Sequence, residues 1–95
     1  MIRSWADRKS QRFFEQGKRS IFRAMDAEAA EELRAALDAA ISLKDLSPLR
    51  GVGLHKLTGD RKGQWAMTVN GPWRIWFRFR DGDAYDVAIV NYHKG

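Results

Sequence analysis

The alternation of residue types between Gln64 and Arg80 limits what this chain can fold into more than any other feature of its sequence. In the segment QWAMTVN, Trp65, Met67 and Val69 are apolar, and the residues between them are small or polar. The segment WRIWFRFR is apolar at its odd-numbered positions, and its even-numbered positions are Arg74, Trp76, Arg78 and Arg80. A period of two is typical of β-strands, because successive side chains point to opposite faces of a sheet. The pattern therefore predicts a sheet with one apolar face and one arginine-rich face.

Turn signals separate the strands of this predicted sheet. Asn70-Gly71, with Pro72 just beyond it, is typical of a hairpin turn. Asp81-Gly82-Asp83 marks another turn, and AYDVAIVNY, which follows it, has the composition of a last strand. From Leu54 onward the sequence thus predicts an antiparallel meander.

The first part of the chain predicts a short strand and a helix. Residues Ile2 to Trp5 have the composition of an opening strand. A helix is expected from Arg8 to Gln16, with Asp7 as its N-cap and Gly17 as its C-terminal stop.

A second helix is expected after Asp26, which is a favourable N-cap residue. Acidic residues follow in the first turns, where the helix dipole favours negative charge. An apolar stripe recurs at helical spacing until Ser47-Pro48 ends the run, and its members are Leu33, Leu37, Ala40 and Ile41.

These elements predict an α+β fold in a single domain, residues 1–95, with an N-terminal strand and two helices packed on one face of a small, mainly antiparallel sheet. Apolar residues make up 44% of the chain, which is enough for a packed core. The sequence has no cysteine, so disulfides and thiolate metal sites are excluded. It also has no unbroken apolar segment of the kind that a signal peptide or membrane span requires. We therefore expect a soluble cytoplasmic protein that does not enter membranes.

The basic residues are unevenly distributed along the chain, which has a net charge of +5. They concentrate in residues 1–23 and 50–80, whereas acidic residues dominate between these segments. If the helices cover the apolar face of the sheet, the arginine-rich face stays open to solvent, because burying it would leave unpaired charges. Aromatic residues among cations form a binding platform for single-stranded nucleic acid. The candidate RNA-binding residues are Lys56, Arg61, Lys62, Trp76, Arg78 and Arg80.

A different explanation of the same residues is purely structural. Trp76 could cover the edge of a small sheet while the arginines pair with acidic residues. The basic surface would then only improve solubility.

The residues that could carry chemistry form a set that needs no metal. The sequence lacks a phosphate-binding glycine loop, an HExxH motif and a cysteine nucleophile. It does contain His55, Lys56, Arg74 and the terminal pair Tyr92-His93. RNA can be cleaved without a cofactor, because its own 2′-hydroxyl attacks the adjacent phosphate once a base removes the proton. A histidine can transfer protons near neutral pH, and a fixed arginine can stabilise the charge on the phosphate.

Two stretches of the sequence resemble a known family. The segment LHKLTGDRKGQWAMTVNGPWRIWFRF and the ending NYH are similar to the HigB-type toxins of the RelE/ParE superfamily, the toxin halves of bacterial toxin–antitoxin operons. The opening segments MIRSW and FFEQGK resemble the family's first strand and first helix. The resemblance therefore runs nearly from end to end.

This resemblance implies a RelE-like fold and a ribosome-dependent endoribonuclease that cuts messenger RNA during translation without a cofactor or metal. By position, His55 matches a catalytic histidine, Arg74 a charge-stabilising arginine, and Tyr92-His93 the terminal pair. Asn91 stands in the catalytic segment where relatives often have an acid, and Thr58 stands where some have a lysine, a charge that Lys56 could supply. The implied partners are a HigA-like helix-turn-helix antitoxin, the 70S ribosome with its mRNA and, through the antitoxin complex, operator DNA.

Two other functions are compatible with the same fold. One is a non-enzymatic, ParE-like toxin that inhibits a protein target such as gyrase, and the other is a plain nucleic-acid-binding module. The titratable His55 and Tyr92-His93 favour the nuclease, since a protein that only binds has no need of them.

The terminal segment generates a direct test. We expect a chain that ends after His93 to remain toxic, because Lys94 and Gly95 lie beyond the motif. A chain that ends after Val90, and the His93→Gln variant, should lose toxicity while still binding the antitoxin. Growth arrest and cleavage of ribosome-bound message are the measurements. Full toxicity of a folded chain that ends after Val90 would exclude the terminal pair from the active site.

Overall fold

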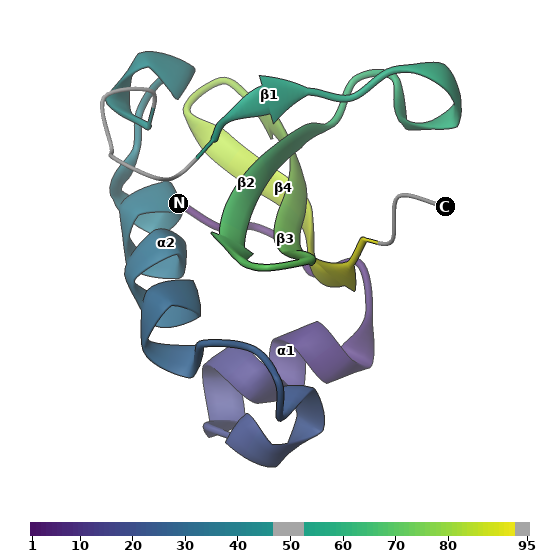
Figure 1. Cartoon of the computed structure of the whole chain (residues 1–95). Helices are drawn as coiled ribbons and strands as arrows, with labels where there is room; N and C mark the ends of the chain where they lie inside the picture. Colours follow the sequence, from purple (N-terminus) through teal and green to yellow (C-terminus); the bar gives the residue numbers. More distant parts are fainter. Residues whose placement is uncertain (47–52, 93–95) are drawn as a thin grey trace.

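The computed structural model describes residues 1–46 and 53–92, and it has helices followed by a meander of strands (Figure 1). The two α-helices are α1 (Arg8–Gln16) and α2 (Ala27–Ala39). Three short 3-10 helices are η1 (Arg19–Phe22), η2 (Leu43–Asp45) and η3 (Gly59–Arg61). The strands are β1 (His55–Lys56), β2 (Trp65–Asn70), β3 (Trp73–Arg80) and β4 (Asp83–Asn91).

The four strands form one sheet in the order β1-β2-β3-β4, and each strand is antiparallel to its neighbour. This arrangement confirms the predicted meander. The first hairpin turns at Gly71 and Pro72, one residue later than the Asn70-Gly71 signal suggested, because Asn70 still pairs with Trp73. The second hairpin turns at Asp81 and Gly82, whose φ angles are 49° and 79°. Two positive φ angles match the twist of the flanking strands and bring them close together.

The N-terminal segment lies along the outer edge of β4. The predicted strand from Ile2 to Trp5 is reduced to two isolated parallel bridges, Ile2 with Ala84 and Trp5 with Val87. Four backbone hydrogen bonds of 2.7–3.1 Å accompany these bridges. Further along the edge, the Ile89 amide donates to the Oγ of Ser10, at 2.9 Å. The segment therefore satisfies edge groups that would otherwise invite pairing with other chains.

Helix α1 begins and ends as its sequence predicts. The carboxylate of Asp7 accepts a hydrogen bond from the Ser10 amide, at 2.7 Å, which caps the first turn. Gly17 ends the helix in the left-handed conformation, with a φ of 67°.

Helix α2 is shorter than the sequence predicts. Its N-cap is Asp26, which accepts from the Ala29 amide at 3.1 Å, but the helix ends at Ala39 rather than continuing toward Ser47. The assignment of Ile41 to the apolar stripe was wrong, because the chain has left the helix there and Ile41 is 79% exposed. The Ser47-Pro48 stop lies outside the described residues.

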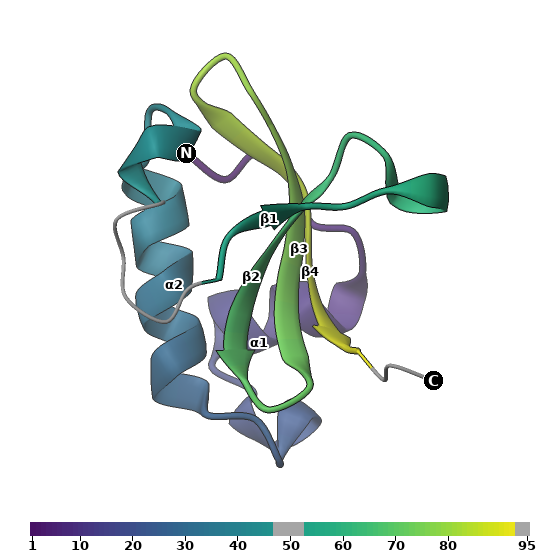
Figure 2. The same cartoon turned by 45° about the horizontal axis from the view of Figure 1, so that its top comes forward.

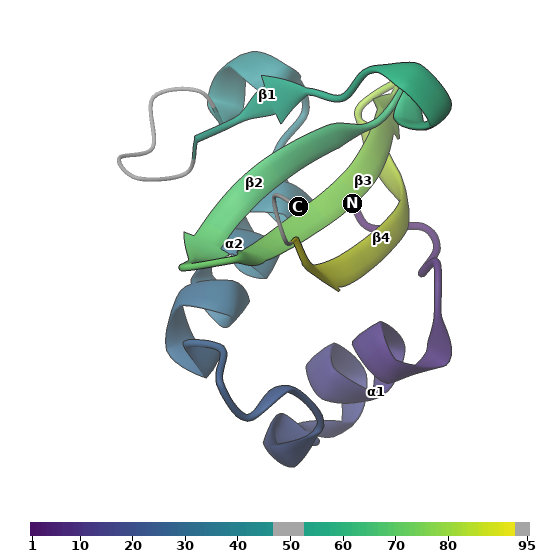
Figure 3. The ribbon, with the colours of Figure 1, turned by 45° about the vertical axis from the view of Figure 1, so that its right-hand side comes forward.

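Both helices pack against the same side of the sheet, where the odd-numbered residues of β2 and β3 point (Figures 2 and 3). Leu33 and Leu37 of α2 meet Met67, Ile75 and Phe77, which are fully buried. A smaller cluster joins α1 to β4, and its buried members are Phe13, Met25, Ala30 and Ile89. The other side of the sheet carries the even-numbered residues of β3 and is here called the open face.

No helix in residues 1–46 and 53–92 combines the length and the apolar character that crossing a membrane requires.

The bond between Ser10 and Ile89 allows a test of how α1 is attached to the sheet. Ser10 is fully buried, so Ser10→Ala leaves the Ile89 amide without a partner and should lower the free energy of unfolding by about 1–3 kcal/mol. Ser4→Ala is the matched control, because the Oγ of Ser4 also accepts from a β4 amide, that of Asp86, but in an exposed setting. Urea unfolding should show a clearly smaller loss for the control. Equal losses of unfolding free energy in the two variants would mean that the burial of Ser10 does not strengthen its contribution.

Candidate active site on the open face

A small pocket on the open face brings together residues that are far apart in the sequence. Its volume is about 150 Å³, and we call it the His55 pocket. The pocket lies on β1, β2, β3 and the residue after β4, and its lining residues are His55, Leu57, Ala66, Arg74, Trp76 and Tyr92. Three residues predicted to be catalytic therefore share one pocket with a residue predicted to bind RNA.

The register of the sheet creates this pocket. His55 lies opposite Ala66, and Ala66 lies opposite Trp76, so the three side chains form a row across one face. Ala66 is only 1% exposed, and its single methyl group leaves space between its two large neighbours. Arg74 precedes Trp76 by two residues on the same face of β3.

Tyr92 is held in place although it follows the last strand. β4 ends at Asn91, one residue before the end of the predicted strand AYDVAIVNY, so Tyr92 is the first residue beyond the sheet. The Tyr92 amide donates to the carbonyl oxygen of Pro72, at 2.8 Å. The Tyr92 ring lies 6.5 Å from the Trp76 ring, centroid to centroid, and Tyr92 remains 47% exposed. The described end of the chain is therefore anchored while its phenol stays accessible.

Arg74 carries an unneutralised charge on the rim of the pocket. One guanidinium nitrogen, Nη1, donates to the carbonyl oxygens of Gly71 at 2.6 Å and Trp73 at 3.0 Å. Nε and Nη2 have no hydrogen-bond partner within the described residues, and no carboxylate there pairs with Arg74. The side chain is thus oriented by the hairpin and still has donors for a phosphate.

The hydrogen bond of His55 determines which of its nitrogens is available. Its Nδ1 lies 3.0 Å from the carbonyl oxygen of Gly53. Because a carbonyl oxygen can only accept, we assign the proton of the neutral ring to Nδ1, which leaves Nε2 free to take up another proton.

A cation lies over the aromatic part of the site. The guanidinium carbon of Arg61, in η3, is 4.8 Å from the centroid of the Trp76 ring. The structural explanation of this face holds only in part. Trp76 is half-buried on β3, which is an interior strand, so it does not cover an edge of the sheet. Arg78 does pair with an acidic residue, Asp86, at 3.4 Å. Arg80, however, has no ion-pair partner among the described residues.

Some predicted residues lie outside the His55 pocket. Lys56 and Lys62 are exposed and do not line it. Asn91 is exposed opposite Trp73 and does not line it either. His93 lies outside the described residues.

Two lining residues were missed by sequence reasoning. Ala66 could have been found, since it is an even-numbered residue that faces the same side as Trp76 across the hairpin. Leu57 follows a two-residue strand, and no pattern in the sequence points to it.

Acidic and histidine side chains do not gather into a metal site anywhere in residues 1–46 and 53–92. The free groups in the His55 pocket are instead an imidazole, a guanidinium and a phenol. Such a set can bind a phosphate and move protons beside it.

Comparison with known protein families shows to which family this chain belongs. Residues 3–93 match the family described as the RelE-like toxin of the type II toxin–antitoxin system HigB. The chain belongs to this HigB-like toxin family. Membership confirms the resemblance found in the sequence, and a type II system implies a cognate antitoxin for this HigB-like toxin.

Individual relatives agree with the family match. The chain is 37% identical over 93 residues to the endoribonuclease HigB of Proteus vulgaris, an alignment that covers 98% of this chain and 100% of that protein. The fold is similar to the crystal structure of a histidine-to-glutamine mutant of YafQ from E. coli, with a TM-score of 0.62 and 16% identity. That superposition covers 96% of this chain and 93% of YafQ, so the predicted RelE-like α+β fold is confirmed.

Proposed function

We propose that this HigB-like toxin is a ribosome-dependent endoribonuclease that cleaves messenger RNA during translation without a metal cofactor. The observation that carries the proposal is the His55 pocket, which joins His55, Arg74 and Tyr92 on an open basic face. The name of its Proteus vulgaris relative, endoribonuclease HigB, supports the same activity.

The proposed reaction uses the RNA's own 2′-hydroxyl. His55 removes the proton of that hydroxyl through Nε2, and the 2′-oxygen forms a bond to phosphorus while the bond from phosphorus to the 5′-oxygen breaks. Arg74 donates its free N–H groups to the phosphate oxygens as negative charge increases on them. Tyr92 holds the nucleotide in line, and His93 protonates the leaving 5′-oxygen. Asn91 supplies no carboxylate, so it takes no proton in this scheme.

The size of the pocket supports the requirement for a ribosome. A volume of about 150 Å³ is below the range of about 300–1,000 Å³ that is typical of pockets that enclose a small molecule. The pocket can therefore hold the reacting group but cannot orient an RNA strand by itself. A ribosome that already holds the message would supply this orientation, which is a large part of the rate enhancement in such reactions.

The remaining open-face residues have proposed roles in binding. Arg61 and Trp76 form a stacked pair that suits a base and its phosphate, and Lys56, Lys62, Arg78 and Arg80 add positive charge around it. We also propose that the antitoxin is a helix-turn-helix protein that links the toxin to operator DNA, and that the toxin acts in the cytoplasm.

Expression without the antitoxin tests the proposed function. Growth and translation should stop, and RNA end-mapping should show cuts that follow the reading frame of translated messages. Growth arrest with intact messages and inhibited gyrase would favour the ParE-like alternative. Intact messages with active gyrase would favour a plain nucleic-acid-binding module.

Substitution of Arg74 tests the site. Arg74→Ala should reduce cleavage of ribosome-bound message by about 10²–10³-fold, because it removes a donor that stabilises the transition state. It should lower the free energy of unfolding by only about 1 kcal/mol, since the two bonds it removes go to one exposed and one partly buried carbonyl group. The matched control is Arg34→Ala, which removes one positive charge from α2 on the opposite side of the sheet and should leave cleavage unchanged. An Arg74→Ala protein that does not fold would mean that Arg74 is a structural residue.

A further inference from the structure

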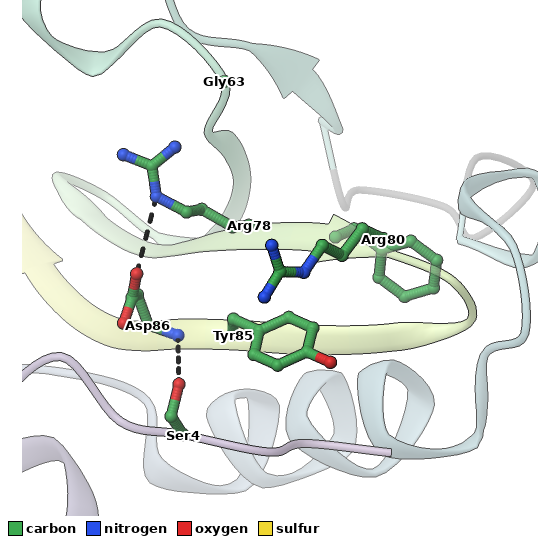
Figure 4. A pocket seen from close by; sticks show the side chains of 7 residues that line it. Ser4, Gly63, Arg78, Arg80, Tyr85 and Asp86 are labelled. Atoms are coloured by element: carbon green, nitrogen blue, oxygen red, sulfur yellow. Dashed lines mark hydrogen bonds and ion pairs between the residues drawn. The ribbon is translucent and has the colours of Figure 1, made fainter.

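A second pocket lies on the open face, apart from the His55 pocket. Its volume is about 380 Å³, and we call it the Arg80 pocket. Figure 4 shows its side chains, and its lining residues are Ser4, Gly63, Arg78, Phe79, Arg80, Tyr85 and Asp86. None of them lines the His55 pocket. Arg80 follows Arg74 by six residues on β3, a distance of about 20 Å along a strand. The two pockets cannot bind the same phosphate.

The Arg80 side chain is positioned in this pocket by contact with an aromatic ring rather than by an ion pair among the described residues. Its guanidinium carbon lies 4.5 Å from the centroid of the Tyr85 ring, and Figure 4 shows the two side chains next to each other. The Arg80 side chain makes no hydrogen bond or ion pair within residues 1–46 and 53–92. A guanidinium stacked on a ring keeps its N–H groups available at its edge, where they match the oxygens of a phosphate.

The second cation of the pocket is paired with an internal carboxylate. The Nε of Arg78 lies 3.4 Å from the Oδ2 of Asp86, and the two side chains are 45% and 53% exposed. A single contact between two exposed groups is weak, because water solvates both of them well. Arg78 can therefore exchange this partner for another anion at little cost.

The backbone around Asp86 explains why its carboxylate reaches Arg78. Asp86 has a φ of 52°, and the pairing of β3 with β4 shifts register here, so the strand carries an extra residue. The Asp86 amide donates to the Oγ of Ser4, at 2.9 Å (Figure 4). The bulge and this hydrogen bond hold Asp86 in the pocket.

On the other side of Arg78, the chain approaches closely at Gly63. A Cβ atom at this position would lie 2.9 Å from the Nη1 of Arg78, and the φ of Gly63 is 92°. A glycine therefore leaves room for the guanidinium beside the backbone that follows η3.

A third hollow, of about 270 Å³, lies next to both pockets. It shares Trp76 with the His55 pocket and Asp86 with the Arg80 pocket. Arg61 also lines it, so a cation and an aromatic ring lie on the path between the two pockets. A single RNA strand could follow this path across the open face.

We propose that the Arg80 pocket binds a backbone phosphate of the same single-stranded RNA, several nucleotides away from the bond that is cut. Arg80 donates to this phosphate, and the phosphate displaces the carboxylate of Asp86 from Arg78. Asp86 is thus an internal competitor that weakens the binding of RNA. The identity of the ligand rests on the function proposed above, whereas the anion site itself rests on the contacts of Arg80, Arg78 and Asp86.

Binding of RNAs of two lengths to the full chain tests this proposal. The probes are 2′-O-methyl oligouridines, which cannot be cleaved, of about twelve nucleotides and about three nucleotides. The phosphodiester groups of the shorter probe are too close together to reach both pockets, which lie about 20 Å apart along β3. Arg80→Gln should weaken binding of the longer probe by about tenfold and reduce its salt slope by about 0.7, the loss of one phosphate contact. Binding of the shorter probe should change much less, because this probe can occupy either pocket but not both at once. Fluorescence anisotropy over a range of salt concentrations measures both quantities.

Asp86→Asn tests the competitor. Asparagine tolerates a positive φ as aspartate does, so the bulge is retained and only the charge is lost. This variant should bind the longer probe more tightly than the native protein, by about threefold to tenfold. Glu32→Gln on α2 raises the net charge by one as Asp86→Asn does, so it is the matched control and should leave binding of the longer probe unchanged. Arg34→Gln on the same helix is the net-charge control for Arg80→Gln and should leave the salt slope unchanged.

Several results would overturn the proposal. These are no binding of the longer probe by the native protein, an equal effect of Arg80→Gln on both probes, or no gain from Asp86→Asn. If Arg80→Gln weakened the binding of double-stranded RNA of equal length by the same factor, the ligand of the pocket would be a folded RNA instead. Cleavage of ribosome-bound message is measured separately. A native protein that does not cleave but shows the expected binding pattern would contradict the proposed function and support the Arg80 pocket.

Discussion

The structure depends on the pairing of β3 with a strand on each side. Because β2 and β4 hold its backbone, the direction of each of its side chains is fixed. Ile75 and Phe77 enter the core, and Arg74 and Trp76 point to the open face. A shift of one residue would bury the arginines and expose the core, so the apolar contacts with α2 also determine where the charges lie. The apolar contacts that stabilise the fold and the side chains of the candidate site therefore lie on opposite faces of β3.

The parts of the fold that were predicted correctly are those governed by neighbours in the sequence. The caps at Asp7 and Asp26 and the two faces of β3 follow from local geometry, and each is present as expected. Ile41 was misplaced because helical spacing alone does not show where α2 ends. The bulge at Asp86 was not predicted either, since it is visible only when β4 is paired with β3.

The candidate site divides in the same way. His55 and Arg74 were identified as residues, but their meeting depends on β1 pairing with β2, and His55 belongs to a strand of only two residues. Ala66 contributes through its small side chain, which leaves room for the pocket. A sequence pattern of polar and apolar residues does not predict where such room will lie. The ion pair of Arg78 with Asp86 joins two strands through a register shift, so no spacing in the sequence predicts it.

The contact between the two ends of the chain affects how the toxin is made. Ser4 and Asp86 are 82 residues apart, and both β-bridges of the N-terminal segment are with β4, the last of the described strands along the chain. A nascent chain therefore holds unpaired N-terminal residues until β4 has emerged, because proteins are synthesised from their N-terminus. The sheet that carries the pocket residues is likewise incomplete until β4 emerges. The His55 pocket includes Tyr92, so it forms only after the chain has been synthesised as far as the residue that follows β4.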